Sequence, residues 1–246
     1  MGPREFYDEL PSTQDRAIAL AREGAPAGTR VVARRQTKGR GRLTRSWASP
    51  EGGLYCSVIV PRPPQHPGLL PLTTGAHLGS ALRAAYALSL LLKWPNDLLV
   101  ERDGLPPGKL AGILTDEVPS PTLGRAVVTG IGVNVRFDRA TLPEPVRGTA
   151  VALGDFVAPV PPLEDVEAMV VASAAEAAEW LSTPEGTRRA RELVRRMLYG
   201  VGRPVTVDGT PAGTIEGLGE EGELWLATDR ERVAIWAGDV RVEADR

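Results

Sequence analysis

Glycine and arginine alternate in the segment from Gln36 to Trp47, which reads Gln-Thr-Lys-Gly-Arg-Gly-Arg-Leu-Thr-Arg-Ser-Trp. Six of the twelve residues from Arg34 to Arg45 are basic, although the net charge of the chain is −2. Glycines let a backbone fold closely around a ligand, and one guanidinium group can bind two oxygens of a phosphate or carboxylate at once. Nothing apolar anchors residues 37–44, so we expect this loop to be mobile without a ligand. Taken alone, the segment fits a solvated surface loop, a nucleic-acid patch or a loop that orders around a small anion.

Two lysines stand at the predicted ends of strands. Lys93-Trp-Pro-Asn-Asp97 closes the apolar run Leu90–Leu92, and a lysine there is costly unless a partner or ligand neutralises it. Lys109-Leu-Ala-Gly-Ile113 is predicted to begin a strand after a flexible turn at 103–108. Gly112 leaves that strand bare, so another group can press against its backbone. Taken singly, these segments also fit an ordinary Pro-Asn-Asp turn and an edge lysine beside a bulge glycine.

The remaining candidate sites are excluded by their spacing. Gly130-Ile-Gly-Val-Asn134 lacks the third glycine of a dinucleotide fingerprint, and Gly104–Lys109 is too short for a phosphate-binding P-loop. Two separated histidines, His66 and His77, and the single Cys56 provide no zinc site. We interpret Cys56 as a small core residue and both histidines as surface residues. Any ATP site is therefore of another kind.

Periodicity predicts a mixed α+β domain at residues 1–199 and a small β domain at 200–246. Ser12 and Asp15 have the spacing of a helix start. Helices are predicted at 12–23, 70–88, 164–181 and 184–198. Strands are predicted at 30–34, 54–60, 90–94, 98–101, 110–118 and 126–135. After Gly202, short β segments alternate with Gly- and Asp-rich turns, which is typical of a small β-barrel.

Composition limits the cellular setting. Lys and Arg (29) nearly balance Asp and Glu (31), so global charge favours neither nucleic acid nor membrane as a partner. No apolar run approaches the roughly 20 residues of a membrane helix, and the first residues lack a signal-peptide pattern. A single cysteine suits a reducing compartment. We expect a cytoplasmic protein.

In their order along the chain, these segments resemble the biotin protein ligases over essentially the whole chain. The family's Gly-Arg-Gly-Arg-x-x-Arg-x-Trp loop matches Gly39–Trp47, and its Lys-Trp-Pro-Asn-Asp matches Lys93–Asp97. Its Lys-Leu-x-Gly-Ile matches Lys109–Ile113, and its Gly-x-Asn matches Gly132–Asn134. The Ser-Thr-Asn that opens the family's first catalytic helix appears here as Ser12-Thr13-Gln14.

The resemblance implies a mixed sheet covered by helices, of the class II synthetase-like type, followed by an SH3-like β-barrel. It also implies formation of biotinyl-5′-AMP from biotin and ATP with Mg²⁺, and transfer of biotin to a lysine of a biotin carboxyl carrier protein. The implied biotin contacts are Ser12, Thr13, Gln14, Gln36, Gly39, Arg40, Gly41, Arg42, Lys109 and Gly112. The implied nucleotide contacts are Arg45, Trp47, Lys93, Asn96, Asp97 and Asn134. Lys109 and Arg42 would act in catalysis, and Asp97 would lie near Mg²⁺.

Two departures and three alternatives accompany the resemblance. Gln14 replaces the usual asparagine, so a direct biotin contact by that side chain does not simply carry over, and Thr44 replaces a common glycine, which predicts a stiffer loop. A lipoate protein ligase shares the expected fold and adenylation chemistry. A DNA-binding repressor would need an additional domain, for which we expect no room before Ser12. An RNA-binding role for Arg34–Arg45 would leave both lysine segments unexplained. Monomer and homodimer both stay open.

Overall fold

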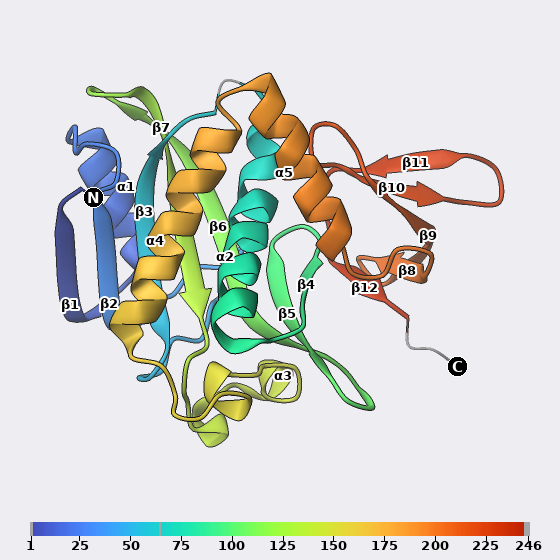
Figure 1. The fold of residues 1–246 in the computed structure, drawn as a ribbon, viewed down its shortest axis with the longest axis horizontal. Coiled ribbons are helices and arrows are strands. Elements are labelled where there is room, and N and C mark those ends of the chain that lie inside the picture. The colour runs from blue at the N-terminus through green and yellow to red at the C-terminus, as the bar shows by residue number, and fades with distance from the viewer. Residues whose placement is uncertain (1, 64, 244–246) are drawn as a thin grey trace.

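A seven-stranded mixed sheet forms the centre of the computed structural model, which describes residues 2–63 and 65–243 (Figure 1). The strand order is β1-β2-β3-β7-β6-β5-β4. Strands β1 and β2 run parallel, and the other neighbours are antiparallel. The strands are β1 (Arg4–Leu10), β2 (Arg30–Gln36), β3 (Leu54–Pro61), β4 (Leu90–Lys93), β5 (Asp97–Arg102), β6 (Leu105–Ser120) and β7 (Gly124–Val133). The predicted mixed α+β architecture is confirmed.

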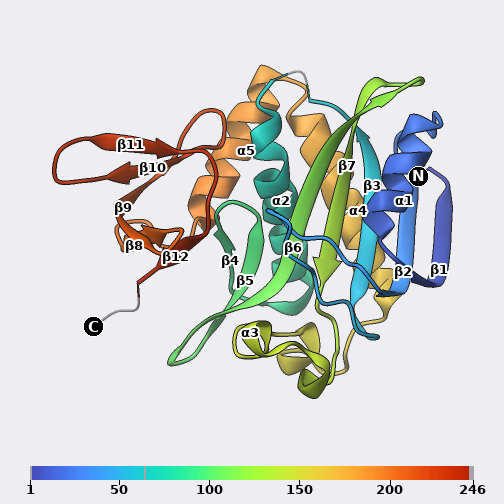
Figure 2. The ribbon, with the colours of Figure 1, turned by 180° about the vertical axis from the view of Figure 1, so that it is seen from behind.

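Helices cover the two faces of this sheet unequally (Figures 1 and 2). Helices α2 (Leu70–Tyr86) and α4 (Leu163–Trp180) pack on one face, with α5 (Pro184–Met197) beside them. Leucine and valine side chains from these helices and from alternate strand positions form the main core there. Helix α1 (Thr13–Arg22) packs alone on the opposite face over a smaller apolar cluster. That face therefore stays partly open beside α1, over β6 and β7.

The ends of the helices follow the signals in the sequence. Ser12 caps α1, and its side chain accepts from the backbone N–H of Asp15. Thr183 caps α5 in the same way through the N–H of Gly186. Shorter helical pieces are α3 (Glu144–Arg147) and three 3₁₀ turns at Pro67–Leu69, Arg139–Thr141 and Leu153–Asp155. Among the described helices, none combines the length and apolar character that a membrane span requires.

Four details of the expected fold are wrong. Strand β1 was not predicted, because its charged residues and the exposed Phe6 leave only Leu10 buried, without a regular apolar alternation. Lys109 does not begin a strand, since β6 already starts at Leu105 and forms a hairpin with β5. His77 is not at the surface: it is 8% exposed between α2 and α4, with its ring edge-on to Trp180 and Nδ1 3.0 Å from Glu176. Trp236, which we expected within a β segment that begins at Val233, lies just after β11 and is 61% exposed.

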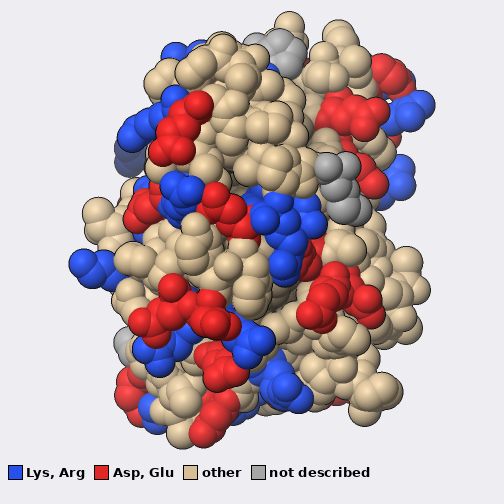
Figure 3. Space-filling view, turned by 90° about the vertical axis from the view of Figure 1, so that its left-hand side faces the viewer, with Lys and Arg blue, Asp and Glu red and all other residues tan. Residues whose placement is uncertain are grey.

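The β1 edge of the sheet carries ion pairs of both signs. Arg34 and Arg35 on β2 pair with Asp8 and Glu9 on β1. The face seen at this edge shows basic and acidic side chains interspersed (Figure 3). Charges of both signs discourage a further strand from pairing with such an edge. They also offer no single-sign surface to a polyanion.

A smaller sheet follows α5. Its five strands are ordered β11-β10-β9-β8-β12, with β8 (Pro204–Val207), β9 (Thr210–Leu218), β10 (Leu224–Ala227), β11 (Arg232–Ile235) and β12 (Val240–Val242). Leu218 and Leu224 belong to the same apolar core as the helices of the larger domain. Trp94 Nε1 donates to the carbonyl of Gly222 at 2.8 Å. The small sheet is thus packed on the rest of the chain, and the boundary at 199/200 stays a prediction.

Candidate functional site

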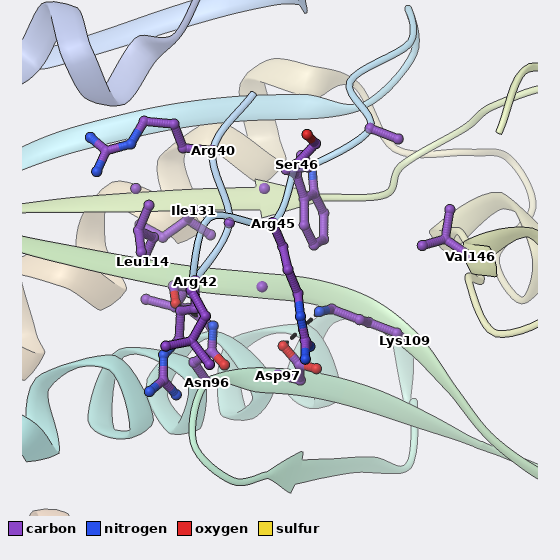
Figure 4. A pocket seen from close by; sticks show the side chains of 18 of the residues that line it. Arg40, Arg42, Arg45, Ser46, Asn96, Asp97, Lys109, Leu114, Ile131 and Val146 are labelled. Carbon is purple, nitrogen blue, oxygen red and sulfur yellow. Dashed lines mark hydrogen bonds and ion pairs between the residues drawn. The ribbon is translucent and has the colours of Figure 1, made fainter. Parts of the chain in front are cut away.

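A cavity of about 240 Å³ opens on the face of the sheet beside α1. Its walls come from the first turn of α1, the loop Gly39–Trp47 (hereafter the Arg loop), the β4–β5 turn, the middle of β6 and β7, residues 142–150 and the turn before β12. Figure 4 shows side chains from the loop and the strands converging on this space. Every residue implied by the resemblance lines it except Gly39, which lies at the base of the loop. Segments far apart in the sequence therefore meet in one site.

One end of the cavity is a hydrogen-bonded chain of neutral side chains. The N–H and hydroxyl of Thr13 both donate to Gln36 Oε1, at 2.8 and 3.1 Å. Ser57 Oγ donates to Thr13 Oγ1 at 2.9 Å, and Gln36 Nε2 donates to Ser49 Oγ at 2.8 Å. Because each hydrogen bond orients the next side chain, this hydrogen-bonded series presents a defined set of polar atoms beside Ser12. Such an end suits an uncharged polar head group.

Gln14 lies next to this chain, and its partners fix its amide. Its Nε2 donates to Asp116 Oδ2 and to the carbonyl of Val128, both at 2.9 Å. Its Oε1 is buried and accepts no hydrogen bond from the described residues. A Cβ on Gly130 would lie 2.4 Å from that oxygen, so the glycine makes room for it.

The floor of the cavity is bare backbone covered by an indole ring. Gly112 on β6 and Gly132 on β7 face Trp47, and a Cβ on either would lie 2.8 or 2.6 Å from its ring. The group that the bare backbone at Gly112 admits is therefore Trp47. The indole Nε1 is buried without an acceptor among the described residues. Lys109 Nζ lies 5.1 Å from the ring centroid of Trp47, which is a cation–π distance.

The Arg loop is folded as a small hairpin. Arg40 and Ser46 form an antiparallel bridge, and the N–H of Gly41 donates to the carbonyl of Arg45 at 2.8 Å. A Cβ at Gly39 would lie 2.4 Å from the carbonyl oxygen of Trp47, which explains a glycine at the base of the hairpin. No part of the loop is buried deeply except Gly39 among its described residues.

The tip of the hairpin is a turn whose backbone conformation is unfavourable for the residues that occupy it. The N–H of Arg45 donates to the carbonyl of Arg42 at 3.0 Å, and the two residues between have φ of 51° (Leu43) and 63° (Thr44). Positive φ at both central positions is typical of a type I′ turn, which favours Asn and Gly. Thr44 is β-branched and is therefore strained there. The glycine common in the family would relieve this strain.

The other end of the cavity is rich in cations. Lys109 Nζ lies 2.7 Å from Asp97 Oδ1. Figure 4 shows Arg45 and Lys109 reaching toward Asp97 from the loop and from β6, with Arg42 nearby. Burial lowers the pKa of the Arg42 guanidinium and the charge of Arg45 adds to this, whereas Asp97 opposes it. Lys93, at the end of β4, completes a group of four basic side chains around Asp97.

The small sheet contributes one carboxylate to this end. Asp239 Oδ2 lies 3.3 Å from Arg45 Nη2 and 3.2 Å from Arg241 Nη2. Burial alone would raise the pKa of Asp239, but Arg45, Lys93 and Arg241 outweigh it and hold that pKa below its ordinary value. Asp239 is therefore ionised at neutral pH and joins the Arg loop to the small sheet.

The two asparagines that the resemblance implies as nucleotide contacts, Asn96 and Asn134, donate hydrogen bonds to the backbone. Asn96 Nδ2 donates to the carbonyl of Ile113 at 2.7 Å, and Asn134 Nδ2 donates to the carbonyl of Lys109 at 3.2 Å. Both amides thereby hold the strand that carries Lys109, and each keeps its Oδ1 for a ligand. Their nucleotide contacts stay a prediction.

The donor set of the cavity fits Mg²⁺ only together with a phosphate ligand. Asp97 and Asp239 are the acidic side chains in its lining, and no group of three or more His, Cys, Asp or Glu that could hold a metal ion exists among residues 2–63 and 65–243. Mg²⁺ commonly binds through one or two carboxylates plus phosphates and water. Asp97 has one oxygen on Lys109 and keeps the other for such an ion.

Sequence reasoning missed several residues of the site. Ser57 had a signal, because it is a small polar residue within the otherwise apolar run Cys56–Val60 of β3. Gly130 and Gly132 were noted in the sequence but given no place in the site, although alternate glycines leave one face of β7 bare. Asp116 and Asp239 had no signal, since only the sheet register and the packing of the small sheet bring them to the Arg loop.

Comparisons with known proteins give a consistent result. The model of the biotin/lipoate A/B protein ligase family matches residues 8–134. The bifunctional ligase/repressor BirA of Bacillus subtilis is 30% identical over 244 residues, covering 96% of this chain and 73% of that protein. The biotin–[acetyl-CoA-carboxylase] ligase of Mycobacterium tuberculosis is 32% identical over 248 residues, covering 93% and 85%. A solved biotin protein ligase from Aquifex aeolicus in complex with biotin and ATP has a TM-score of 0.80 and 27% identity, covering 100% of both chains.

Proposed function

The chain belongs to the biotin/lipoate A/B protein ligase family, and we propose that it joins biotin to a lysine of a biotin carboxyl carrier protein at the expense of ATP. The observation that carries this proposal is the division of one cavity into a neutral hydrogen-bonding end and a cationic end. Biotin has a neutral ureido ring, an apolar chain and a carboxylate. Its carboxylate would thus meet the phosphates of ATP among the four basic side chains.

In the first half-reaction, a carboxylate oxygen of biotin attacks the α-phosphorus of ATP, and pyrophosphate leaves. Both reactants are anionic, so fixed cations are needed where their oxygens approach. Lys109 belongs to the cationic end, and we assign it to the biotin carboxylate and the α-phosphate. Arg42, Arg45 and Lys93 would bind the remaining phosphate oxygens. Orientation and charge neutralisation suffice, without an enzyme nucleophile.

When bound, Mg²⁺ would neutralise phosphate charge, and Asp97 would hold it through the oxygen that Lys109 does not use. The nearby Lys109 keeps the Asp97 carboxylate in a fixed position. Trp47 offers the nucleotide a ring face and a buried indole N–H. The Oδ1 atoms of Asn96 and Asn134 are further acceptors at this end.

In the second half-reaction, the amine of the carrier lysine attacks the carbonyl carbon of biotinyl-5′-AMP, an amide forms, and AMP leaves. The mixed anhydride is sensitive to water, so the site must be covered while it waits. The Arg loop would provide that cover, and the small sheet, which we propose to be an SH3-like barrel, closes the nucleotide side through Asp239. We propose a cytoplasmic enzyme that acts without DNA.

Lipoate is the nearest alternative substrate within the family. Ser57, Thr13 and Gln36 are hydrogen-bonded to one another, and a dithiolane ring, unlike a ureido ring, could not use their remaining hydrogen-bonding capacity. A site built to hydrogen-bond its substrate discriminates against an analogue that lacks the matching polar groups. Exchange of labelled pyrophosphate into ATP tests this choice. We expect exchange that requires biotin and is not supported by lipoate; the reverse dependence would reassign the substrate.

A further inference from the structure

Arg40 differs from the other arginines of the Arg loop in its partners. Its Nη1 lies 2.9 Å from Asp15 Oδ1 on α1, and its Nη2 lies 3.3 Å from Asp116 Oδ1 on β6. Figure 4 shows it pointing away from the Asp97 end, toward which Arg45 reaches. One guanidinium thus joins the loop to a helix and to a strand.

Asp116 is itself held in place by Gln14. The second carboxylate oxygen of Asp116, Oδ2, accepts from Gln14 Nε2 at 2.9 Å. The same Nε2 donates to the carbonyl of Val128, so both protons of the amide are used and its orientation is fixed. An asparagine would place this amide about 1.5 Å short, the length of one C–C bond. The glutamine at this position is therefore long enough to support Asp116 from α1.

We infer that Gln14 and Asp116 are positioning residues of the Arg loop. They hold Arg40, and through it they keep the hairpin Gly39–Trp47 against the sheet before any ligand binds. Neither residue needs to touch biotin or nucleotide for this role. The inference rests on the proposed function only in treating the Arg loop as the cover of the site.

The expected effect is moderate, because water reaches these groups. The side chains of Arg40 and Asp116 are 36% and 30% exposed, and that of Asp15 is 59% exposed. Exposed ion pairs contribute little, and partly buried charge-assisted hydrogen bonds contribute more. Loss of the Asp116 charge should therefore raise the open fraction of the loop about threefold to tenfold.

Limited trypsin digestion of the ligand-free protein measures this open fraction, with cleavage followed after Arg42 and Arg45. Asp116→Asn keeps the shape of the side chain and removes its charge, and Gln14→Leu removes the amide. Glu117→Gln is the matched control, because Glu117 is the next carboxylate on β6 and pairs with Arg62 and Arg125 instead. We expect about threefold to tenfold faster cleavage in Asp116→Asn and the wild-type rate in the control.

A second background shows whether Asp116 acts through Arg40. In Arg40→Gln, adding Asp116→Asn should change the cleavage rate no further. The inference would be overturned if a correctly folded Asp116→Asn protein were cleaved at the wild-type rate. It would also be overturned if Asp116→Asn raised the cleavage rate as much in the Arg40→Gln background as in the wild type. No ligand is present in this digestion, so its outcome is independent of whether the site adenylates biotin. If Gln14→Leu does not fold, the Asp116→Asn result still decides.

Discussion

Arg45 in the Arg loop and Asp239 in the small sheet lie 194 positions apart in the chain, yet Nη2 of the first is 3.3 Å from Oδ2 of the second. The ion pair joins the Arg loop to the small sheet. A polyphosphate arriving at Arg45 would compete with Asp239 for the same guanidinium. With Arg45 in the nucleotide-binding role that we propose, the pair would connect nucleotide binding with the position of the loop.

Replacing Asp239 should affect ATP and not biotin. Asp239→Asn removes the partner of Arg45, and for a pair whose Arg45 side chain is 58% exposed we expect about a twofold to fivefold change in the KM for ATP. The KM for biotin should stay unchanged, because the neutral end is remote from Asp239. Steady-state pyrophosphate exchange measures both constants. Asp229→Asn, in the turn between β10 and β11, is the control, and an equal effect there would remove any special role of Asp239.

Lys109 should be needed for chemistry and dispensable for folding. Lys109→Ala removes a cation from the point where we propose that the two anionic reactants meet, and such a loss typically costs about 10²–10³ in rate. Its ion pair with Asp97 is partly exposed, so the melting temperature should change little. Pyrophosphate exchange and a thermal melt report the two properties. Near-wild-type exchange would refute the assignment, and Lys38→Ala, an exposed lysine just before the loop, should behave as wild type.

Thr44 should limit closure of the Arg loop. Thr44→Gly removes the strain of a β-branched residue at φ 63°, a conformation that costs about 1 kcal/mol for residues other than glycine. The closed hairpin should then be favoured about fivefold, seen as slower tryptic cleavage after Arg42 and Arg45 with biotin and ATP present. Thr37→Gly, outside the turn, should instead leave cleavage unchanged or speed it. Faster cleavage of Thr44→Gly would show that the turn is not what holds the loop open.

Glu167 should make stability depend on acid pH. This buried carboxylate of α4 binds Arg4 on β1 and Arg30 on β2, and hydrogen bonds from Arg4 in particular lower its pKa below 4.5. A lowered pKa means that the stabilisation is complete above about pH 4.5 and is lost as pH falls through the folded-state pKa. Glu167→Gln should therefore cost about 2 kcal/mol at pH 7, and less at pH 3.5. Urea unfolding at both pH values checks this; an equal cost at both would exclude the ion pairs as its cause.

Local patterns in the sequence predicted most of the fold and one side of the site. Helix α1 and the strands β3 and β7 follow from their caps and apolar runs, and the motif residues of the lysine segments do meet in one cavity. Strand β1 was not predicted because only Leu10 of its residues is buried, so the strand has no regular apolar alternation. His77 was misplaced because a polar residue buried between two helices looks the same in sequence as one at the surface.

Contacts between distant segments account for what the sequence could not predict. Asp116 reaches Arg40 only because β6 pairs with β7 in one register and α1 crosses above them. Asp239 reaches Arg45 only because the small domain packs on α5 and accepts a hydrogen bond from Trp94. No residue near Asp116 or Asp239 in the chain signals either contact.

The most direct test of the central claim is transfer itself. The purified chain would be incubated with ATP, Mg²⁺, biotin and a biotin carboxyl carrier domain, and the carrier would be analysed by intact mass and peptide mapping. The proposed function predicts one biotin on one lysine, dependent on ATP and absent with Lys109→Ala. A carrier that stays unmodified by wild-type protein that is folded and binds biotin would contradict it.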